Sequence, residues 1–439
     1  MLMNKLCLLI ISSLIYIGSI FAQSADEQIG EAINASDLFL LQEKYDSLKG
    51  QVQTPMLHAF SEALLNTVFN YPEHAVKSID GLVTHFQGEI GFDNVKNMLD
   101  WQNHILFRMG EYCDASNRAA SFMEQVAPHM DTQTLEGMRN TARFYKSMCG
   151  EKKSELIRPA EDCVIPLYIE PLEIKGGRKG HMPYITAIVN GIEERFIFDT
   201  GCPGGLFLSE EYARKLGVRV TLDSLQVNGA GGSDWGKMGI LDSIIVGNMT
   251  FKNLVVTIVP PNPAVDTIFK MDRIIGSDIM LHAGEVQIYP KEQKIVFPVR
   301  KTPMPATGRN ILKMGNDLFL AKVYSGEERL IMFLDTGDSA SGMSFNYYEK
   351  NKETIDRIGE KASVLTGGFG GVLKNEYYTI PSLPLRIGEK SFEMKDIGVG
   401  INPHQIFSFG NNDGSLGMAF INLFDKVTIN FNDMFIEVE

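Results

Sequence analysis

Two aspartates in this 439-residue chain sit in the same short sequence context. Residues 196–201 read Phe-Ile-Phe-Asp-Thr-Gly and residues 332–337 read Met-Phe-Leu-Asp-Thr-Gly, so each apolar stretch runs into an Asp-Thr-Gly turn. Two carboxylates held close together cannot both ionise, and a pair that shares one proton supplies a base and an acid at one place. Hydrolysis of a peptide bond needs both. Asp199 and Asp335 are therefore candidate catalytic residues.

The segments around the two aspartates repeat in the same order. Each Asp-Thr-Gly ends a predicted hairpin, and each is followed by a glycine-rich turn, Gly229-Ala-Gly-Gly232 in the first copy and Gly367-Gly-Phe-Gly-Gly371 in the second. Later come Ile274-Ile-Gly276 and Ser415-Leu-Gly417, each leading to a closing hairpin. One Asp-Thr-Gly alone could be an ordinary turn. Four landmarks in the same order predict a duplicated lobe.

This combination of motifs resembles the aspartic proteases, and within them the retropepsin-like branch, over residues 163–439. The resemblance implies an all-β, two-lobed barrel fold of the pepsin and retropepsin kind, with one lobe at residues 160–302 and the other at 303–439. It also implies an aspartic-type endopeptidase that acts on polypeptide through a water activated by the two aspartates.

The same resemblance assigns roles to the neighbours of the aspartates. Thr200 and Thr336 would hydrogen-bond across the lobe junction, and Gly201 and Gly337 would allow the tight backbone of each loop. A later strand would pass closely behind each loop at Gly276 and Gly417. The two turns would be flaps that close over an extended substrate, with these glycines in them: Gly229, Gly231, Gly232, Gly367, Gly368, Gly370 and Gly371.

The chain departs from the family at the residue after each Asp-Thr-Gly, where Ser or Ala is usual. Cys202 stands there in the first copy, and we expect a buried or disulfide-bonded sulfur rather than a redox-sensitive thiol. Asp338 stands there in the second copy, and we expect its side chain to point to solvent. If it pointed inward it would raise the proton affinity of the pair. Asp338 therefore supports an alternative function, a catalytically silent pseudoprotease that binds peptide.

Residues 25–155 have helical rather than strand periodicity. Apolar residues recur at spacings of three and four in Leu57, Phe60, Leu64 and Val68, and again in Val76, Ile79, Val83 and Phe86. Turns at residues 70–72 and 110–112 suggest a degenerate helical-hairpin repeat similar to the tetratricopeptide family. Such a domain could dock a protein partner, or serve as a scaffold or cover. A second alternative is thus a docking module with structural β lobes.

The N-terminal sequence and the composition indicate the compartment of the protein and limit its partners. Residues 1–22 predict a cleaved signal peptide, hence a secreted or periplasmic protein with no stable membrane span after cleavage. A net charge of −13 disfavours a nucleic acid partner. Downstream remain Cys113, Cys149, Cys163 and Cys202, whose pairing the sequence leaves open among three full connectivities. No spacing suggests a metal site, and we expect neither metal nor cofactor.

Overall fold

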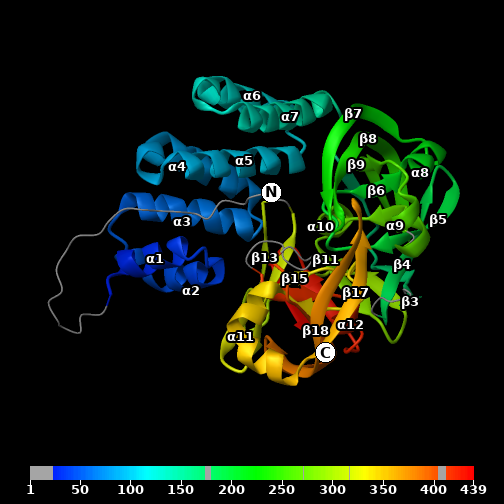
Figure 1. The fold of residues 1–439 in the computed structure, drawn as a ribbon. Helices are drawn as coiled ribbons and strands as arrows, with labels where there is room; N and C mark the ends of the chain where they lie inside the picture. The colour runs from blue at the N-terminus through cyan, green and yellow to red at the C-terminus, as the bar shows by residue number, and fades with distance from the viewer. Residues whose placement is uncertain (1–22, 174–178, 270, 316, 404–411) are drawn as a thin grey trace. The chain divides into compact units, whose positions relative to one another are not determined.

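The structure, a computed structural model, describes residues 23–173, 179–269, 271–315, 317–403 and 412–439 (Figure 1). The predicted signal peptide at 1–22 lies outside these residues. Packing divides the chain into two compact units, Met1–Arg108 and Met109–Glu439. Among the helices of the described ranges, none is both long enough and apolar enough to cross a bilayer.

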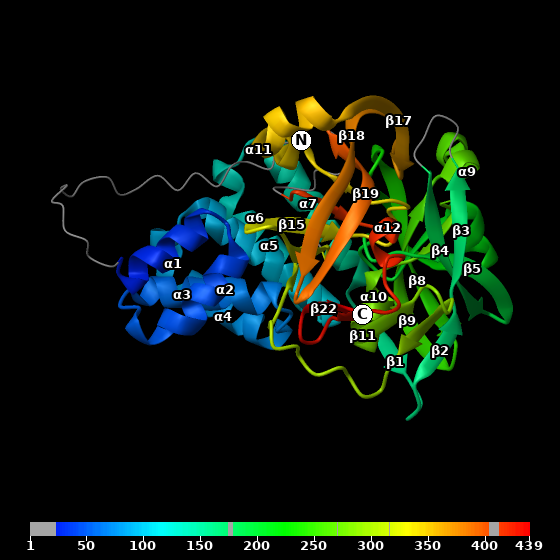
Figure 2. The same cartoon turned by 90° about the horizontal axis from the view of Figure 1, so that it is seen from below.

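The first unit is helical. A capping box at Ser24 and Glu27 starts its first helix, and Pro72 occupies the first turn of the fourth, where a missing N–H costs nothing. Buried side chains such as Phe39, Phe60 and Ile79 form its core. The helices stack in Figure 2 and are α1 (Ala25–Asn34), α2 (Leu38–Leu48), α3 (Pro55–Val68), α4 (Pro72–Ile90) and α5 (Phe92–Arg108), with a short 3-10 turn η1 (Lys49–Gln51).

Two further helices belong to the second unit. They are α6 (Tyr112–Val126) and α7 (Thr132–Met148), separated by η2 (Ala127–His129). A disulfide joins Cys113 to Cys149 across this hairpin. The fully buried Met148 meets the Thr221 hydroxyl on the first flap strand, with 3.8 Å between Sδ and Oγ1. The compact units divide the chain at residue 108, and the helical domain at 25–155 remains a prediction.

A nine-stranded sheet forms the first lobe, in the order β1-β9-β6-β10-β5-β4-β8-β7 with β3 beside β4. It already includes β1, ahead of residue 160. In the sequence, helices α8 (Glu210–Lys215) and α9 (Pro263–Phe269) lie between its strands, and α10 (Ser277–Ala283) follows the last of them. The strands are β1 (Glu155–Ile157), β3 (Tyr168–Glu173), β4 (Lys179–Val189), β5 (Ile192–Phe198), β6 (Leu206–Ser209), β7 (Arg219–Gly229), β8 (Gly232–Val246), β9 (Met249–Val259) and β10 (Arg273–Ile275).

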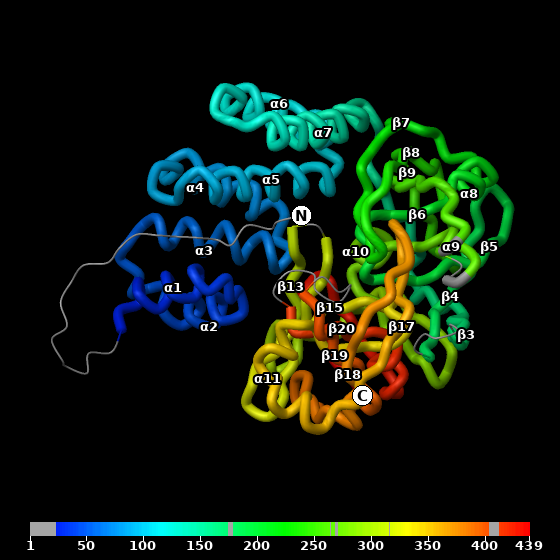
Figure 3. Tube along the Cα trace, viewed as in Figure 1, coloured from blue at the N-terminus to red at the C-terminus, as the bar shows by residue number. Residues whose placement is uncertain are grey.

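An eight-stranded sheet forms the second lobe, in the order β13-β14-β15-β20-β16-β19-β18-β17. Helices α11 (Phe345–Ile358), labelled in Figure 3, and α12 (Met418–Ile421), labelled in Figure 2, accompany it. The strands are β13 (Ile311–Lys313), β14 (Phe319–Ser325), β15 (Glu328–Leu334), β16 (Gly342–Met343), β17 (Glu360–Gly368), β18 (Gly371–Ile387), β19 (Lys390–Gly400) and β20 (Gly414–Leu416). The series β19-β16-β20-β15-β14 repeats β9-β6-β10-β5-β4 of the first lobe, with the same parallel and antiparallel pairings.

A third sheet joins the two lobes. Its order is β2-β12-β11-β21-β22, and the junction is the antiparallel pair of β11 and β21, where Val286 lies opposite Ile429. The closing hairpins predicted for the two copies thus pair with each other. The strands are β2 (Cys163–Pro166), β11 (Glu285–Tyr289), β12 (Lys294–Phe297), β21 (Val427–Asn430) and β22 (Phe435–Val438).

Candidate active site

The two Asp-Thr-Gly loops occupy matching places in the duplicated sheets. β5 ends immediately before Asp199 and pairs in parallel with β10, and the Asp199 N–H donates to the Ile275 carbonyl at 3.1 Å. β15 ends immediately before Asp335 and pairs in parallel with β20, and the Asp335 N–H donates to the Leu416 carbonyl at 3.0 Å. The duplicated topology therefore brings both aspartates to the junction of the lobes.

Thr200 and Thr336 link the two loops by reciprocal hydrogen bonds. The N–H of each donates to the Oγ1 of the other at 3.0 Å. The Thr200 hydroxyl then donates to the Leu334 carbonyl at 3.0 Å. The Thr336 hydroxyl donates to the Phe198 carbonyl at 2.6 Å. Both threonines are buried, so these bonds form away from competing water and hold the loops in one relative position.

The carboxylates of Asp199 and Asp335 each lie against the glycine of the other loop. A Cβ atom built on Gly201 would collide with the Asp335 carboxylate, and one built on Gly337 would collide with that of Asp199. Inside its own loop each carboxylate accepts a backbone N–H, from Gly201 to Asp199 Oδ1 at 2.7 Å and from Gly337 to Asp335 Oδ1 at 2.9 Å. Glycine is required at both positions because any side chain would separate the pair.

Burial and mutual repulsion change the acidity of this pair. Burial raises the pKa of Asp199, whose side chain is 6% exposed. Burial, followed by the charges of Asp199 and Asp338, raises the pKa of Asp335 well above its ordinary value. Two neighbouring carboxyls with raised pKa values retain a shared proton to higher pH than an isolated carboxyl does. The arrangement can therefore act as acid and base at one place.

Gly276 and Gly417 mark close passages of the chain behind the loops. A Cβ on Gly276 would approach the Gly204 carbonyl oxygen to 2.5 Å, and one on Gly417 would collide with the carbonyl oxygens of Asp338 and Ala340. The Gly276 N–H donates to the Gly205 carbonyl at 2.9 Å. A larger residue at either position would push the strand away from the loop that it supports.

The predicted flap glycines form the tips of two long hairpins. β7 and β8 turn at Ala230 and Gly231, and β17 and β18 turn at Phe369 and Gly370. The tips contact each other, because the Gly231 N–H donates to the Phe369 carbonyl at 2.8 Å. The Phe369 ring packs edge-to-face on Phe207 of the first lobe, with ring centroids 5.3 Å apart. Together the tips cover the space above the aspartates.

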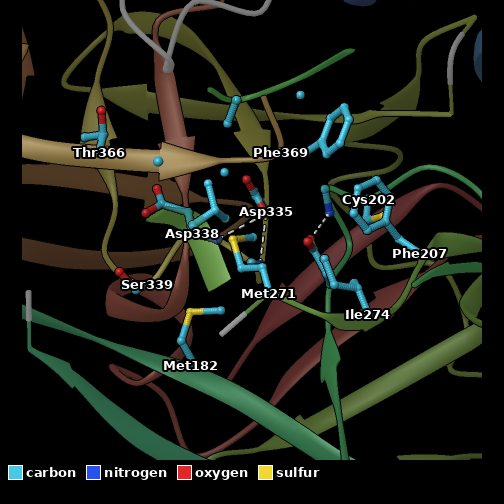
Figure 4. Close-up of a pocket in the computed structure, with 18 of the residues that line it drawn as sticks. Met182, Cys202, Phe207, Met271, Ile274, Asp335, Asp338, Ser339, Thr366 and Phe369 are labelled. Carbon is cyan, nitrogen blue, oxygen red and sulfur yellow. Dashed lines mark hydrogen bonds between the residues drawn. The ribbon is translucent and has the colours of Figure 1, made fainter. Parts of the chain in front are cut away.

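A cavity of about 490 Å³ lies beneath the flap tips and is lined by both aspartates. Its first-lobe wall includes Met182, Phe207, Met271 and Ile274 (Figure 4). The flap residues at its roof come from residues 227–230 and 364–369. In size and lining the cavity resembles an enclosed ligand site with a few polar groups at its base.

Asp338 does not point to solvent, so that expectation is wrong. Its side chain is half-buried and lines the cavity (Figure 4). Oδ1 accepts the Ala340 N–H at 3.0 Å and Oδ2 accepts the Ser415 hydroxyl at 2.6 Å. The Asp338 N–H donates to Asp335 Oδ1 at 3.1 Å. The carboxylate turns inward because the buried Ser415 hydroxyl, distant in sequence, supplies a donor there.

Cys202 is a free, half-buried thiol that lines the same cavity. Burial raises its pKa well above the ordinary value, and the charges of Asp199, Asp335 and Asp278 act in the same direction. A thiol held in the neutral form is a poor nucleophile and a poor target for oxidants. Cys163 is also free and buried. The bridge lies instead between Cys113 and Cys149, a pairing that the sequence left open.

Several residues of the site escaped the sequence analysis as functional residues. Ser415 was considered only as part of a repeated motif. A signal was present, because the first copy has the apolar Ile274 at the position where the second copy has the polar Ser415. Phe369 and Phe207 had no signal, since an aromatic residue in a turn or a strand is ordinary. In the described part of the chain, no group of three or more His, Cys, Asp or Glu side chains is placed to hold a metal ion.

Parts of this chain are similar to known proteins. A family model described as Aspartyl protease matches residues 185–279, which include the first Asp-Thr-Gly loop. No curated protein matches the chain. A retropepsin-like aspartic protease from Rickettsia conorii is similar in structure at 20% identity, over 33% of this chain and 92% of its own, with a TM-score of 0.21.

Two plant seed proteins are also similar in structure. Basic 7S globulin from soybean and conglutin gamma, a basic 7S globulin from lupine seeds, each match at 9% identity over 63% of this chain and 94% of their own, with a TM-score of 0.38. Scores of this size transfer no function. The family match, together with the duplicated sheets and paired Asp-Thr-Gly loops, supports an aspartic-protease fold for the β-rich part of the chain.

Proposed function

We propose that this protein is an aspartic endopeptidase, with Asp199 and Asp335 as its catalytic pair. The observation that carries the proposal is the placement of a buried carboxyl, Asp199, and a half-buried one, Asp335, each against the glycine of the other loop, at the base of a flap-covered cavity. Packing alone does not call for two adjacent carboxyls withdrawn from solvent, because removing such charges from water destabilises the fold. The family match to aspartyl proteases supports the same reaction class.

The proposed reaction uses one proton shared by the pair. A water between the carboxyls attacks the carbonyl carbon of the substrate and gives its proton to the ionised Asp199, while the protonated Asp335 donates to the carbonyl oxygen. The carbon–nitrogen bond then breaks as Asp199 gives its proton to the leaving nitrogen, and a hydroxyl of the intermediate returns a proton to Asp335 to leave a carboxylic acid product. We assign the initial proton to Asp335 because the neighbouring charge of Asp338 raises its pKa further.

We propose further that residues 160–302 and 303–439 act as the two lobes of the enzyme and that Thr200 and Thr336 keep the pair aligned. Export from the cytoplasm, with removal of residues 1–22, belongs to the same proposal. It is supported by the apolar N-terminal run and by the Cys113–Cys149 disulfide, since such bridges persist in oxidising compartments.

The test is cleavage of an unfolded protein between about pH 3 and about pH 7. Wild-type protein, Asp199→Asn, Asp335→Asn and the exposed-site control Asp242→Asn are compared, with circular dichroism to verify folding. We expect fragments from wild type and from the control, and none from the two dyad variants. Absence of cleavage by wild type over the whole range, or full activity in either dyad variant, would refute the proposal.

The second candidate function is a pseudoprotease that binds peptide without cutting it. The inward carboxylate of Asp338 favours it, because a third negative charge disturbs the sharing of one proton by the pair. The same experiment separates the two functions if peptide binding is measured in parallel. Saturable binding by a wild-type protein that never cleaves would establish the pseudoprotease. A docking role for the first, helical unit remains a prediction.

A further inference from the structure

The two halves of the cavity differ in polarity at matching positions. Cys202 and Asp338 each follow an Asp-Thr-Gly. Ile274 and Ser415 each stand two residues before the glycine that lies behind the loop, Gly276 in the first lobe and Gly417 in the second. The strand registers agree, since Ile274 lies opposite Ile197 and Ser415 lies opposite Phe333, each two residues before an aspartate. The first lobe thus has an apolar pair where the second lobe has an acidic, hydroxylated pair.

The first-lobe half is apolar around Met182 and Ile274, although Asp266 of the same lobe also lines the cavity. Met182 and Ile274 are buried there, and the partly buried Phe207, Met271 and Cys202 pack against them. In the view of Figure 4, Phe207 and Asp338 lie on opposite sides of Asp335. This half fits an apolar side chain, whose transfer from water it would favour.

The second-lobe half has a negative charge that the described protein does not neutralise. Asp335 and Asp338 line the cavity from this lobe, in addition to Asp199 and Asp266 from the first, whereas no Lys, Arg or His is found among the described residues lining it. Within the described ranges Asp338 has hydrogen bonds to Ala340 and Ser415 but no ion pair. A carboxylate has about four acceptor sites, so Asp338 retains capacity for a further donor from the cavity side.

The lobe architecture does not by itself call for a carboxylate at position 338, because the first lobe has a cysteine at the equivalent position. A half-buried carboxylate beside another acidic pair is unfavourable until a cation approaches it. An incoming ammonium or guanidinium group would relieve this repulsion and form a charge-assisted hydrogen bond. Ser415, which is 2% exposed, holds Oδ2 by its hydroxyl and so fixes the direction of the carboxylate.

We propose that Asp338 is a specificity-determining residue. It selects polypeptides in which a Lys or Arg side chain flanks the peptide bond held at Asp199 and Asp335, with an apolar side chain on the other side of that bond. The inference rests on the proposed function for the position of the cut. The preference in binding, however, does not require that the bond be cut.

The test measures peptide binding by the full-length Asp199→Asn protein. Extended peptides carry a fixed Phe followed or preceded by Lys, norleucine or Glu, and norleucine preserves the aliphatic stem of Lys without its charge. Of the two Lys peptides, with Lys before or after Phe, we expect the tighter binder to have about tenfold higher affinity than the norleucine peptide of the same order. The Glu peptide of that order should bind most weakly. Added salt should narrow the gap between Lys and norleucine, because it screens a charge pair.

Two further substitutions in this background assign the preference to one side chain. Asp338→Asn preserves shape and can still accept the Ala340 N–H, and it should bring the ratio of Lys to norleucine affinity to about one. Asp242→Asn removes an exposed aspartate of β8 and should leave the ratio unchanged. Melting curves verify that each protein is folded.

The outcomes separate this inference from the proposed catalysis. Equal affinity for Lys and norleucine peptides, a ratio untouched by Asp338→Asn, or no binding of any peptide would overturn the specificity proposal. If wild type cuts peptides without regard to basic residues, catalysis stands and this inference fails. If wild type cuts nothing while the Asp199→Asn protein prefers Lys through Asp338, catalysis fails and the inference stands.

Discussion

Asp335 is the residue at which the electrostatics of the site converge. It is half-buried beside two other carboxylates, Asp199 and Asp338, and both its desolvation and their charges favour its protonated form. Cys202 faces the same carboxylates and is kept neutral for the same reason. The site is thus an acidic pocket that retains a proton on its carboxyls. The direction of the pKa shifts determines how its stability and activity depend on pH.

Replacing Asp335 by Asn should stabilise the fold at neutral pH. The pKa of Asp335 is higher in the folded state than the unfolded value of about 3.9, so its contribution is full at low pH and is lost as the pH rises through the folded value. An amide keeps the neutral form at every pH. We expect Asp335→Asn to melt at a higher temperature than wild type at pH 7, with the difference vanishing near pH 3. A constant difference would contradict the raised pKa.

Asp338 should set the upper pH limit of cleavage. Its negative charge disfavours ionisation of Asp335, so Asp338→Asn should lower the pKa of Asp335. The alkaline limb of kcat/KM, which reports the dyad in the free enzyme, should therefore move to lower pH. A pH profile with an uncharged substrate tests this directly. A limb that stays in place or moves to higher pH would exclude this role.

At the scale of elements, the two flap tips meet at closely packed glycine backbone. A Cβ on Gly231 would collide with the backbone of Gly371, and one on Gly370 would approach the Gly232 backbone to 2.5 Å. Gly370 also has φ +94°, which side chains disfavour. The repeated glycines are therefore the condition for contact between the tips.

Gly370→Ala should separate the flap tips. We expect faster amide hydrogen exchange at residues 229–232 and 367–371, and a fall in kcat/KM on the order of tenfold to a hundredfold, since small displacements of groups that position substrate have effects of this size. Gly137→Ala is the matched control, because a Cβ there meets nothing within 4 Å and should slightly stabilise α7. Equal behaviour of the two variants would show that the tip contact is unimportant.

The disulfide between Cys113 and Cys149 should stabilise the hairpin of α6 and α7. It closes a loop over a sequence separation of 36 residues, and bridges over such loops contribute roughly 2–4 kcal/mol. The double variant Cys113→Ser/Cys149→Ser should lower the free energy of unfolding by about this amount. Cleavage should persist, because neither cysteine lines the cavity. Non-reducing peptide mapping that finds another pairing would contradict the assignment.

At the scale of the whole molecule, the β-rich lobes and the helices α6 and α7 form one packed unit. α7 contributes Met148 against Thr221, and the Arg219 side chain pairs with Glu151 at 2.6 Å just beyond that helix. All described residues of the cavity lie within Met109–Glu439. Stability and activity should therefore follow this division of the chain rather than the change from helix to strand.

Two fragments distinguish these divisions. Residues 109–439 should fold and cleave substrate, because they contain the whole described site. Residues 155–439 lose α6 and α7 and expose the surface of β7 that Met148 covers, so they should be less stable by about 2–5 kcal/mol, as for removal of a large buried side chain. Denaturant unfolding measures both. Fragments of equal stability would favour a boundary at the end of the helices.

The sequence alone determined the local features of this protein. Apolar runs before Asp199 and Asp335, paired glycine-rich turns and a shift from helical to strand periodicity are short-range patterns, and short-range sterics and burial translate them into elements. The helices before residue 150 and the strands after it, as well as both flap hairpins, appear in the structure where these patterns predicted them. A repeat within the helices remains a prediction.

Only the tertiary structure decided which distant groups meet. The Ser415 hydroxyl reaches Asp338 across 77 residues and turns that carboxylate into the cavity. The same holds for the pairing of β11 with β21, the disulfide of Cys113 with Cys149, and the packing of α7 on β7. Such partners are chosen by the packing of the whole chain, and no local pattern encodes them. The pair of Asp-Thr-Gly loops could thus be read from the sequence, while the direction of the Asp338 carboxylate beside them was decided by the fold.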